Sequence, residues 1–162
     1  ARLYAYVEAR THYGEALKAL DHLPPDDTID RTVIDLTIGL ARVSQVADEP
    51  GINLARLKRA EERVGHLFAR SGLAEDRLRL ARVLLFQALS YMMCGDATAA
   101  ANACFQRVLP VAQEFQDEEL LVAPSTNIGK ILVINGRFRD AIPLFRGVIE
   151  PLARWDDLTE GS

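Results

Sequence analysis

The chain has 162 residues, of which 49% are hydrophobic and 26% are charged, and 23 acidic against 19 basic residues give a formal net charge of −4. The apolar content suffices for a substantial core and excludes a disordered tail, while the acidic balance argues against a nucleic-acid partner. No apolar run approaches the roughly 20 residues that cross a bilayer, and no signal-peptide pattern opens the chain, so we expect no membrane partner.

Turn signals such as Pro24–Pro25, Pro50–Gly51 and Asn135–Gly136 divide the chain into segments of helical length. Between them apolar residues recur at intervals of three and four, and no segment alternates as a strand would. The sequence therefore predicts an all-α protein. We expect helices over residues 1–11, 13–22, 29–47, 52–71, 74–94, 97–115, 118–135 and 138–154.

The prolines test these helix assignments. Pro124 and Pro143 are expected in the first turns of their helices, where a missing N–H group costs little. Pro110 and Pro151 fall late in theirs and should bend or loosen them.

An internal repeat indicates how the helices are organised. Residues 90–96 align with residues 131–137 at a shift of 41, and residues 107–117 align with residues 147–157 at a shift of 40. We place the extra residue of the first copy in the turn after Gly95. A period near 40 with two helices in each unit predicts a helical solenoid. Residues 1–162 then form a single domain of about four hairpins, at approximately 1–23, 29–72, 74–116 and 118–155.

Small residues indicate where the helices of a hairpin approach closely. Gly129 is expected to face Ala141, with Phe145 filling the space one turn further on, and an equivalent set is Ala88, Ala101 and Phe105. The alternative is that these are ordinary core residues of a globular helical bundle, and the repetition at a fixed shift weighs against it.

The spacing of Gly129, Ala141 and Phe145 resembles the tetratricopeptide (TPR) pattern of glycine, alanine and an aromatic residue. The chain departs from that pattern at Ser125, where the family has tryptophan, and in its longer period. The resemblance implies a right-handed α-α superhelix, that is, a TPR-like solenoid.

A narrower resemblance is to the repeat region of bacterial putative class III adenylate/guanylate cyclases that carry an AAA-type ATPase core. It spans about residues 29–155. The segments that carry it are residues 79–82, 95–96, 112–117, 127–129 and 136–142. The resemblance implies a signalling protein in which this chain is one part. We also expect the chain to be a fragment, because it begins at Ala1 without a methionine.

Catalytic and metal-binding patterns are sparse. His12, His22 and His66 show no metal-ligand spacing. Cys94 and Cys104 are too few for a disulfide scaffold, and we expect two reduced, largely buried thiols in a cytoplasmic protein. Gly129-Lys130 lacks the preceding glycine of a phosphate-binding loop, and the adjacent carboxylates fit helix ends and solvated faces. The arginines at 77, 79 and 82 fit a solvated helix better than an anion site. We therefore expect no catalytic residue, cofactor or metal, and no enzyme activity in this chain.

The first helix of each hairpin would line a concave groove suited to an extended peptide or an amphipathic helix. Counting from Gly129 by the resembled repeat, the partner-binding positions are Arg82, Leu85, Leu89, Met92, Ala123, Thr126, Lys130 and Val133. Families that clamp a terminal carboxylate have several Lys and Asn residues there, and only Lys130, with Asn127 beside it, approximates that. The alternative is that Leu85 and Leu89 simply pack against the next hairpin.

The favoured hypothesis is a non-catalytic module for protein–protein contact or intramolecular regulation inside a larger signalling ATPase or cyclase. A second hypothesis is an effector-sensing domain that binds a small molecule in the concave groove, and a third is a stand-alone enzyme. An exposed apolar end carrying Leu3, Tyr4 and Val7 would also allow a homodimer.

Overall fold

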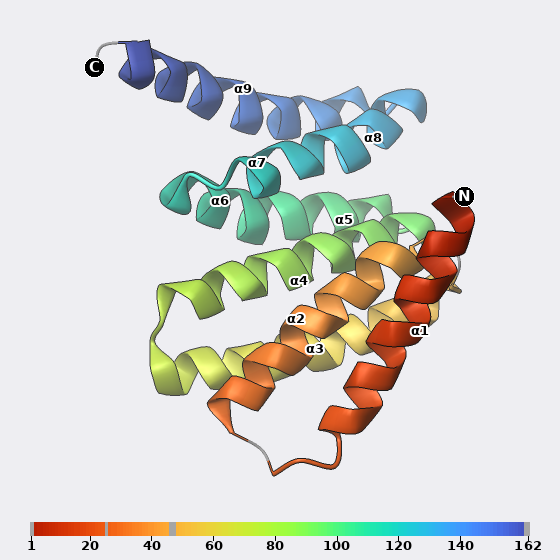
Figure 1. The fold of residues 1–162 in the computed structure, drawn as a ribbon. Helices are drawn as coiled ribbons and strands as arrows, with labels where there is room; N and C mark the ends of the chain where they lie inside the picture. Colours follow the sequence, from red (N-terminus) through yellow and green to blue (C-terminus); the bar gives the residue numbers. More distant parts are fainter. Residues whose placement is uncertain (1, 25, 46–47, 161–162) are drawn as a thin grey trace.

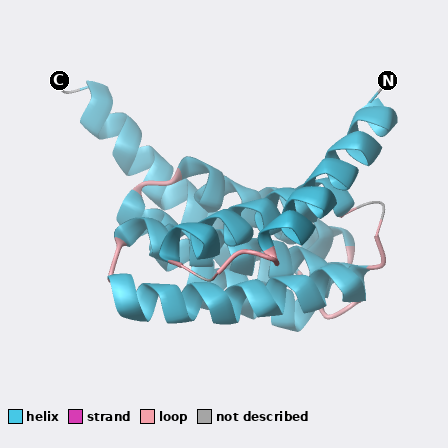
Figure 2. Ribbon diagram, turned by 60° about the horizontal axis from the view of Figure 1, so that its bottom comes forward, coloured by secondary structure: helices cyan, strands magenta, loops and turns pink. Residues whose placement is uncertain are grey.

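The computed structural model describes residues 2–24, 26–45 and 48–160, and it leaves undescribed the side chains of residues 2–4, 105, 125 and 155–160. All regular secondary structure in this part of the chain is helical (Figures 1 and 2). The α-helices are α1 (Arg2–Leu20), α2 (Asp27–Ser44), α3 (Pro50–Ser71), α4 (Ala74–Met93), α5 (Ala97–Ala103), α6 (Leu109–Phe115), α7 (Glu118–Pro124), α8 (Lys130–Ile134) and α9 (Phe138–Glu160). Two π-helical segments join them, η1 (Cys104–Val108) between α5 and α6, and η2 (Ser125–Gly129) between α7 and α8.

The helices stack in chain order, each against the one before it (Figure 1). Helices α5, η1 and α6 form one continuous rod, as do α7, η2 and α8. Helix α2 also contacts α4, and α4 also contacts α7 and η2. Helix α4 therefore contacts both α2 and the rod α7–η2–α8, and these three rods lie side by side.

The first predicted hairpin is wrong. Residues 2–20 form one helix, α1, where we expected two helices with a break near residue 12. Gly14 lies inside it and costs only about 1 kcal/mol relative to alanine, which packing of α1 on α2 can offset. Tyr13 belongs to that packing, because its ring lies directly over Gly39, where an added Cβ would be 2.6 Å from Tyr13 Cε1.

The other predicted helices agree with the structure, with ends shifted by a few residues. Helix α2 begins two residues early because the Asp26 carboxylate accepts a hydrogen bond from the Ile29 N–H group at 2.8 Å. Helix α3 also begins two residues early, with Pro50 at its first position. Helix α9 continues to Glu160, six residues beyond the expected end.

The two segments that align at a shift of 41 end in the same kind of turn. The Asp96 N–H group bonds to the Tyr91 carbonyl at 2.9 Å, and the Gly95 N–H group to the Met92 carbonyl at 3.0 Å. The N–H groups of Arg137 and Gly136 make the same bonds to the carbonyls of Leu132 and Val133, at 2.8 and 3.0 Å. Both are Schellman turns, and both glycines have the positive φ that this turn requires, 85° and 72°.

The extra residue lies in a helix and not in the turn after Gly95. Ala100 and Val108 are buried eight residues apart, whereas their counterparts Ala141 and Val148 are buried seven apart. The first copy carries η1 in this interval, where the Leu109 N–H group reaches back five residues to the Cys104 carbonyl. A π-helical turn holds one more residue than an α-helical turn, so the shift changes from 41 to 40 there. The counterpart of Ala141 is accordingly Ala100 and not Ala101, and the expected role of the Phe105 side chain lies outside the described residues.

The prolines lie inside helices more often than we expected. Pro124 is the seventh residue of α7 and Pro143 the sixth of α9, so neither is in a first turn. Pro124 immediately precedes η2, and Pro110 follows η1 by two residues. A proline cannot donate to the carbonyl four residues back, and a local change to π-helical bonding is one way in which a helix continues past it. Pro151 lies within α9, which runs on through it.

Two hydrophobic clusters meet at α4. One joins α2, α3 and α4, with Ile34, Leu57, Val64 and Leu67 fully buried. The other runs from α4 to α9 and is built around a second set of fully buried residues, namely Ala88, Cys104, Val108, Leu121, Ile128 and Leu132. Because residues of α4 are buried on both sides of this helix, the two clusters meet there and span α2 to α9.

Gly129 faces the ring of Phe145 in the last hairpin. A Cβ atom at residue 129 would lie 3.1 Å from Phe145 Cζ. We expected Gly129 to face Ala141, but the atoms nearest to it belong to the ring of Phe145.

Candidate functional site

The structure divides the eight predicted groove residues into two groups. Leu85 and Met92 are buried in the core, at 4% and 9% exposure, and cannot meet a partner. Leu89 is half-buried against both hydrophobic clusters, so the packing role that we held as the alternative applies to it. Arg82 is half-exposed and pairs with Asp117 at 3.0 Å.

The other four predicted residues reach the surface to different degrees. Thr126, Lys130 and Val133 are exposed, and Ala123 is half-buried. Counting by α-helical spacing does not keep them in line, however, because η2 intervenes between Ala123 and Lys130. One additional residue in a turn rotates every later side chain by about 100° about the axis. The predicted row of groove residues is thus interrupted at η2, in the middle of the rod α7–η2–α8.

A buried carboxylate anchors α4 to α2. Asp76 is completely buried, and its two oxygens accept hydrogen bonds from Nε and Nη2 of Arg31, each at 3.0 Å. The Ser71 hydroxyl donates to the same carboxylate at 2.6 Å, and Arg79 Nη1 donates at 3.1 Å. The hydrogen bonds from Arg31 and Ser71 hold the pKa of Asp76 below its usual value, although burial acts in the opposite direction.

Further ion pairs cross between the rods that lie side by side. Arg79 of α4 forms two hydrogen bonds to Asp35 of α2, at 2.9 and 3.1 Å. Arg82 reaches Asp117, just before α7, and Arg42 of α2 reaches Glu119 of α7. Paired charges therefore cross the surface on which we expected the groove residues. The sequence contained the arginines at 79 and 82 as a cluster, but Asp35 and Asp117, which they reach on other elements, lie 44 and 35 residues away along the chain.

A cleft opens among these charges. It has a volume of about 270 Å³ and is lined by α1, α2, α4 and α7. Its lining residues are Tyr13, Asp35, Ile38, Gly39, Arg42, Arg82 and Glu119. We call it the inner cleft. The absence of a side chain at Gly39 gives Tyr13 its place in the wall.

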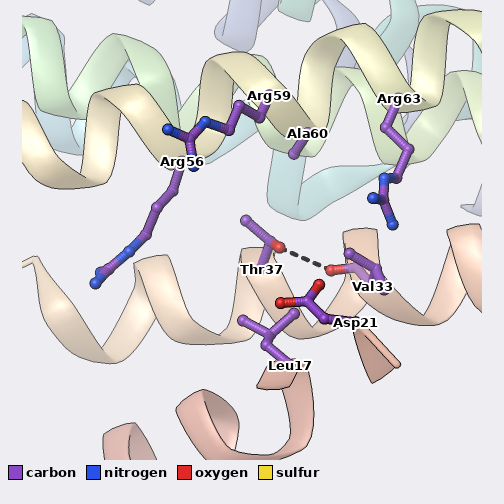
Figure 3. A pocket seen from close by; sticks show the side chains of 8 residues that line it. All are labelled: Leu17, Asp21, Val33, Thr37, Arg56, Arg59, Ala60 and Arg63. Carbon is purple, nitrogen blue, oxygen red and sulfur yellow. Dashed lines mark hydrogen bonds between the residues drawn. The ribbon is translucent and has the colours of Figure 1, made fainter. Parts of the chain in front are cut away.

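A second cavity lies among α1, α2 and α3 and has a volume of about 280 Å³ (Figure 3). Leu17 and Asp21 come from α1 and the turn after it, Val33 and Thr37 from α2, and Arg56, Arg59, Ala60 and Arg63 from α3. We call it the arginine pocket. The three arginines recur at intervals of three and four, so they share one side of α3. The sequence analysis did not identify this cluster, although the spacing was visible in the chain.

The thiols and imidazoles form no reactive cluster in the described part of the chain. Cys94 is exposed, contrary to expectation, whereas Cys104 is fully buried and burial raises its pKa to about 12. His12 lies 3.8 Å from Glu15, and both are exposed. Within the described residues no group of three His, Cys, Asp or Glu side chains could hold a metal ion. Within the same residues, no helix is both long and apolar enough to cross a bilayer.

The chain was compared with known proteins at three levels. No protein-family model, no curated protein and no solved structure matches it.

Proposed function

We propose that this chain is a non-catalytic helical-repeat module that binds a protein or peptide segment on the face formed by α2, α4 and α7–η2–α8. The observation that carries the proposal is the repetition of one hairpin unit, with the same Schellman turn at Gly95 and Gly136. Stacked hairpins of this kind present an extended surface that suits an elongated partner. The contacts of α2 with α4 and of α4 with α7 and η2 support a solenoid, and we propose that it is a TPR-like, right-handed α-α superhelix.

The inner cleft would be the centre of the binding surface. Arg42 and Arg82 line it, with side chains 58% and 40% exposed; Arg42 pairs with Glu119 of the same lining, and Arg82 pairs with Asp117 outside it. An acidic side chain of a partner could exchange with Glu119 at little cost, because the Arg42–Glu119 pair is exposed and such pairs contribute only about 0–1 kcal/mol. The expected partner is therefore an extended segment with acidic residues. Lys130 would extend the cationic surface along the rod α7–η2–α8.

A peptide-display selection against the purified chain tests this proposal. We expect the selected peptides to be acidic. The double variant Arg42→Ala with Arg82→Ala should weaken their binding by about tenfold or more. Arg146→Ala is the matched control, because Arg146 is exposed on α9 away from the cleft. Peptides that bind both variants equally well, or a selection that yields none, would contradict the proposal. Leu89→Asp is unsuitable as a test, because Leu89 packs in the core.

The wider context is part of the same proposal. The resemblance to the repeat regions of signalling ATPases and nucleotide cyclases supports a regulatory role within such a protein, in the cytoplasm. Self-association is proposed as well, because Val7 and Tyr6 of α1 and Ile149 of α9 are more than half exposed. The side chains of Leu3 and Tyr4 lie outside the described residues. Light scattering over a range of concentrations tests this, and a strict monomer would contradict it.

A small effector in the same groove is the second candidate. The inner cleft, at about 270 Å³, is slightly smaller than the about 300 Å³ at which small-molecule sites begin. Its charged walls are already paired with one another, which favours a peptide that exchanges ion pairs over a molecule that needs free partners. Saturable thermal stabilisation by one class of compound, lost in Arg42→Ala, would reverse this preference.

A further inference from the structure

The arginine pocket contains an acid and a base that face the same space and are not paired with each other. Arg59 and Asp21 are both exposed, and among the described residues neither side chain has a hydrogen-bond or ion-pair partner. In Figure 3 the Asp21 carboxylate lies in front of α2 beside Thr37, and the Arg59 guanidinium lies along α3. A ligand with groups of opposite charge at its two ends could meet both.

The other two arginines are already held. Arg56 Nη1 donates to Asp48 at 2.8 Å, and Arg63 Nη1 lies 3.5 Å from Asp30. Asp48 also binds Arg10, and Asp30 also binds Arg70, so each of these two carboxylates is shared between two arginines. The local charge therefore favours one anionic group on the ligand, near Arg59 and Arg63. Figure 3 shows the Arg63 guanidinium directed from α3 toward α2, into the pocket.

The rest of the pocket limits the size and polarity of the ligand. Leu17, Val33 and Ala60 contribute its apolar walls, and Ala60 is 5% exposed. The Thr37 hydroxyl lines the pocket but already donates to the Val33 carbonyl at 2.7 Å. A volume of about 280 Å³ holds a molecule with a short apolar group and little more. A bulky polyanion would place further negative charge against Asp21.

We infer that the arginine pocket binds a free amino acid with a small apolar side chain, its carboxylate on Arg59 and Arg63 and its ammonium group on Asp21. This site is separate from the inner cleft. Val33 and Thr37 lie about half a turn around α2 from Asp35 and Arg42, which line the other cavity. Arg59 is exposed and unpartnered, so its side chain can swing toward the ligand without breaking a contact.

Calorimetric or NMR titration of the chain with leucine tests the inference. We expect saturable binding at millimolar concentrations, weakened about five- to tenfold by Arg59→Ala and by Asp21→Asn. N-acetyl-leucine, which lacks the ammonium group, and leucinamide, which lacks the carboxylate, should both bind less well than leucine. Leucinamide should bind more weakly than N-acetyl-leucine, because arginines outnumber their carboxylate partners around the pocket. Arg146→Ala is the control and should bind leucine as the unmodified chain does.

Three outcomes of the titrations with leucine and its analogues would overturn the inference. They are the absence of saturable binding up to about 10 mM leucine, equal binding of N-acetyl-leucine, or undiminished binding to Arg59→Ala. Binding of inorganic phosphate that matches or exceeds that of leucine would also overturn it, because it would show a simple anion site. Loss of peptide binding in Arg42→Ala with leucine binding intact separates this inference from the proposed function.

Discussion

Asp76 of α4 is fully buried, and both its oxygens accept hydrogen bonds from the guanidinium of Arg31 on α2, 45 residues earlier in the chain. The bidentate geometry fixes the two helices at one relative position, because both N–H···O bonds must form together. Arg79 and then Asp35 extend the network back to α2. The contact between the first rods of two successive hairpins is thus made by charges as well as by apolar side chains.

Asp76→Asn should destabilise the fold by about 2–3 kcal/mol, because it leaves the arginines around a buried position without their counter-charge. Chemical denaturation measures this. Asp35→Asn is the matched control, since the Asp35 side chain is 52% exposed, and we expect it to cost under about 1 kcal/mol. Equal losses in the two variants would show that burial of Asp76 does not matter.

The low pKa of Asp76 also predicts how stability depends on pH. In the folded chain the pKa of Asp76 lies below its ordinary value of 3.8. The stabilisation from this carboxylate is therefore fully present above pH 3.8 and is lost as pH falls through the lower, folded-state pKa. The difference in unfolding free energy between the unmodified chain and Asp76→Asn should stay constant from neutral pH to about pH 5 and shrink at more acidic pH. A difference that grows on acidification would contradict the assigned direction.

Gly129→Ala should destabilise the chain by about 1 kcal/mol, because its Cβ atom would lie 3.1 Å from the Phe145 ring in a packed hairpin. Gly65→Ala is the control, since a Cβ atom at Gly65, inside α3, has nothing within 4 Å. That variant should gain about 0.5–1 kcal/mol from helix propensity alone. Thermal unfolding of the two variants separates packing from propensity. If Phe145 causes the loss, Phe145→Leu should reduce the penalty of Gly129→Ala.

Cys94 should react faster than Cys104, because Cys104 becomes accessible only when the helices around it open. Cys94 is exposed, whereas Cys104 is fully buried in η1, with its pKa raised to about 12 by burial. At pH 8 a thiol reagent should modify Cys94 quickly, and Cys104 only as the helices open, because the thiolate is the reactive form. In denaturant both should react at once. Rapid modification of Cys104 in Cys94→Ser under native conditions would contradict the packing of α5 to α6.

The sequence by itself determined the helical class, the approximate bounds of most helices and the two glycine turns. Apolar residues at helical spacing and glycines at helix ends are local signals, and the turns at Gly95 and Gly136 follow directly from them. The length of α1 could not be predicted from the sequence. The contact of Tyr13 with Gly39 on α2 helps to hold a continuous helix through Gly14, and that contact is between different helices. Nor could the position of the extra residue be predicted, since π-helical bonding in η1 leaves no distinct spacing in the chain.

The candidate sites were decided by tertiary structure. Leu85 and Met92 share the apolar spacing of a groove, and only the packing of α4 between two clusters makes them core residues. Arg82 was visible as a charge, but its partner Asp117 is 35 residues away. The arginine pocket needs three helices, and spacing along α3 alone supplies only one of its walls. Helix formation depends on neighbours within about one turn, whereas a binding site depends on which helices meet, and that is settled by burial summed over the whole stack.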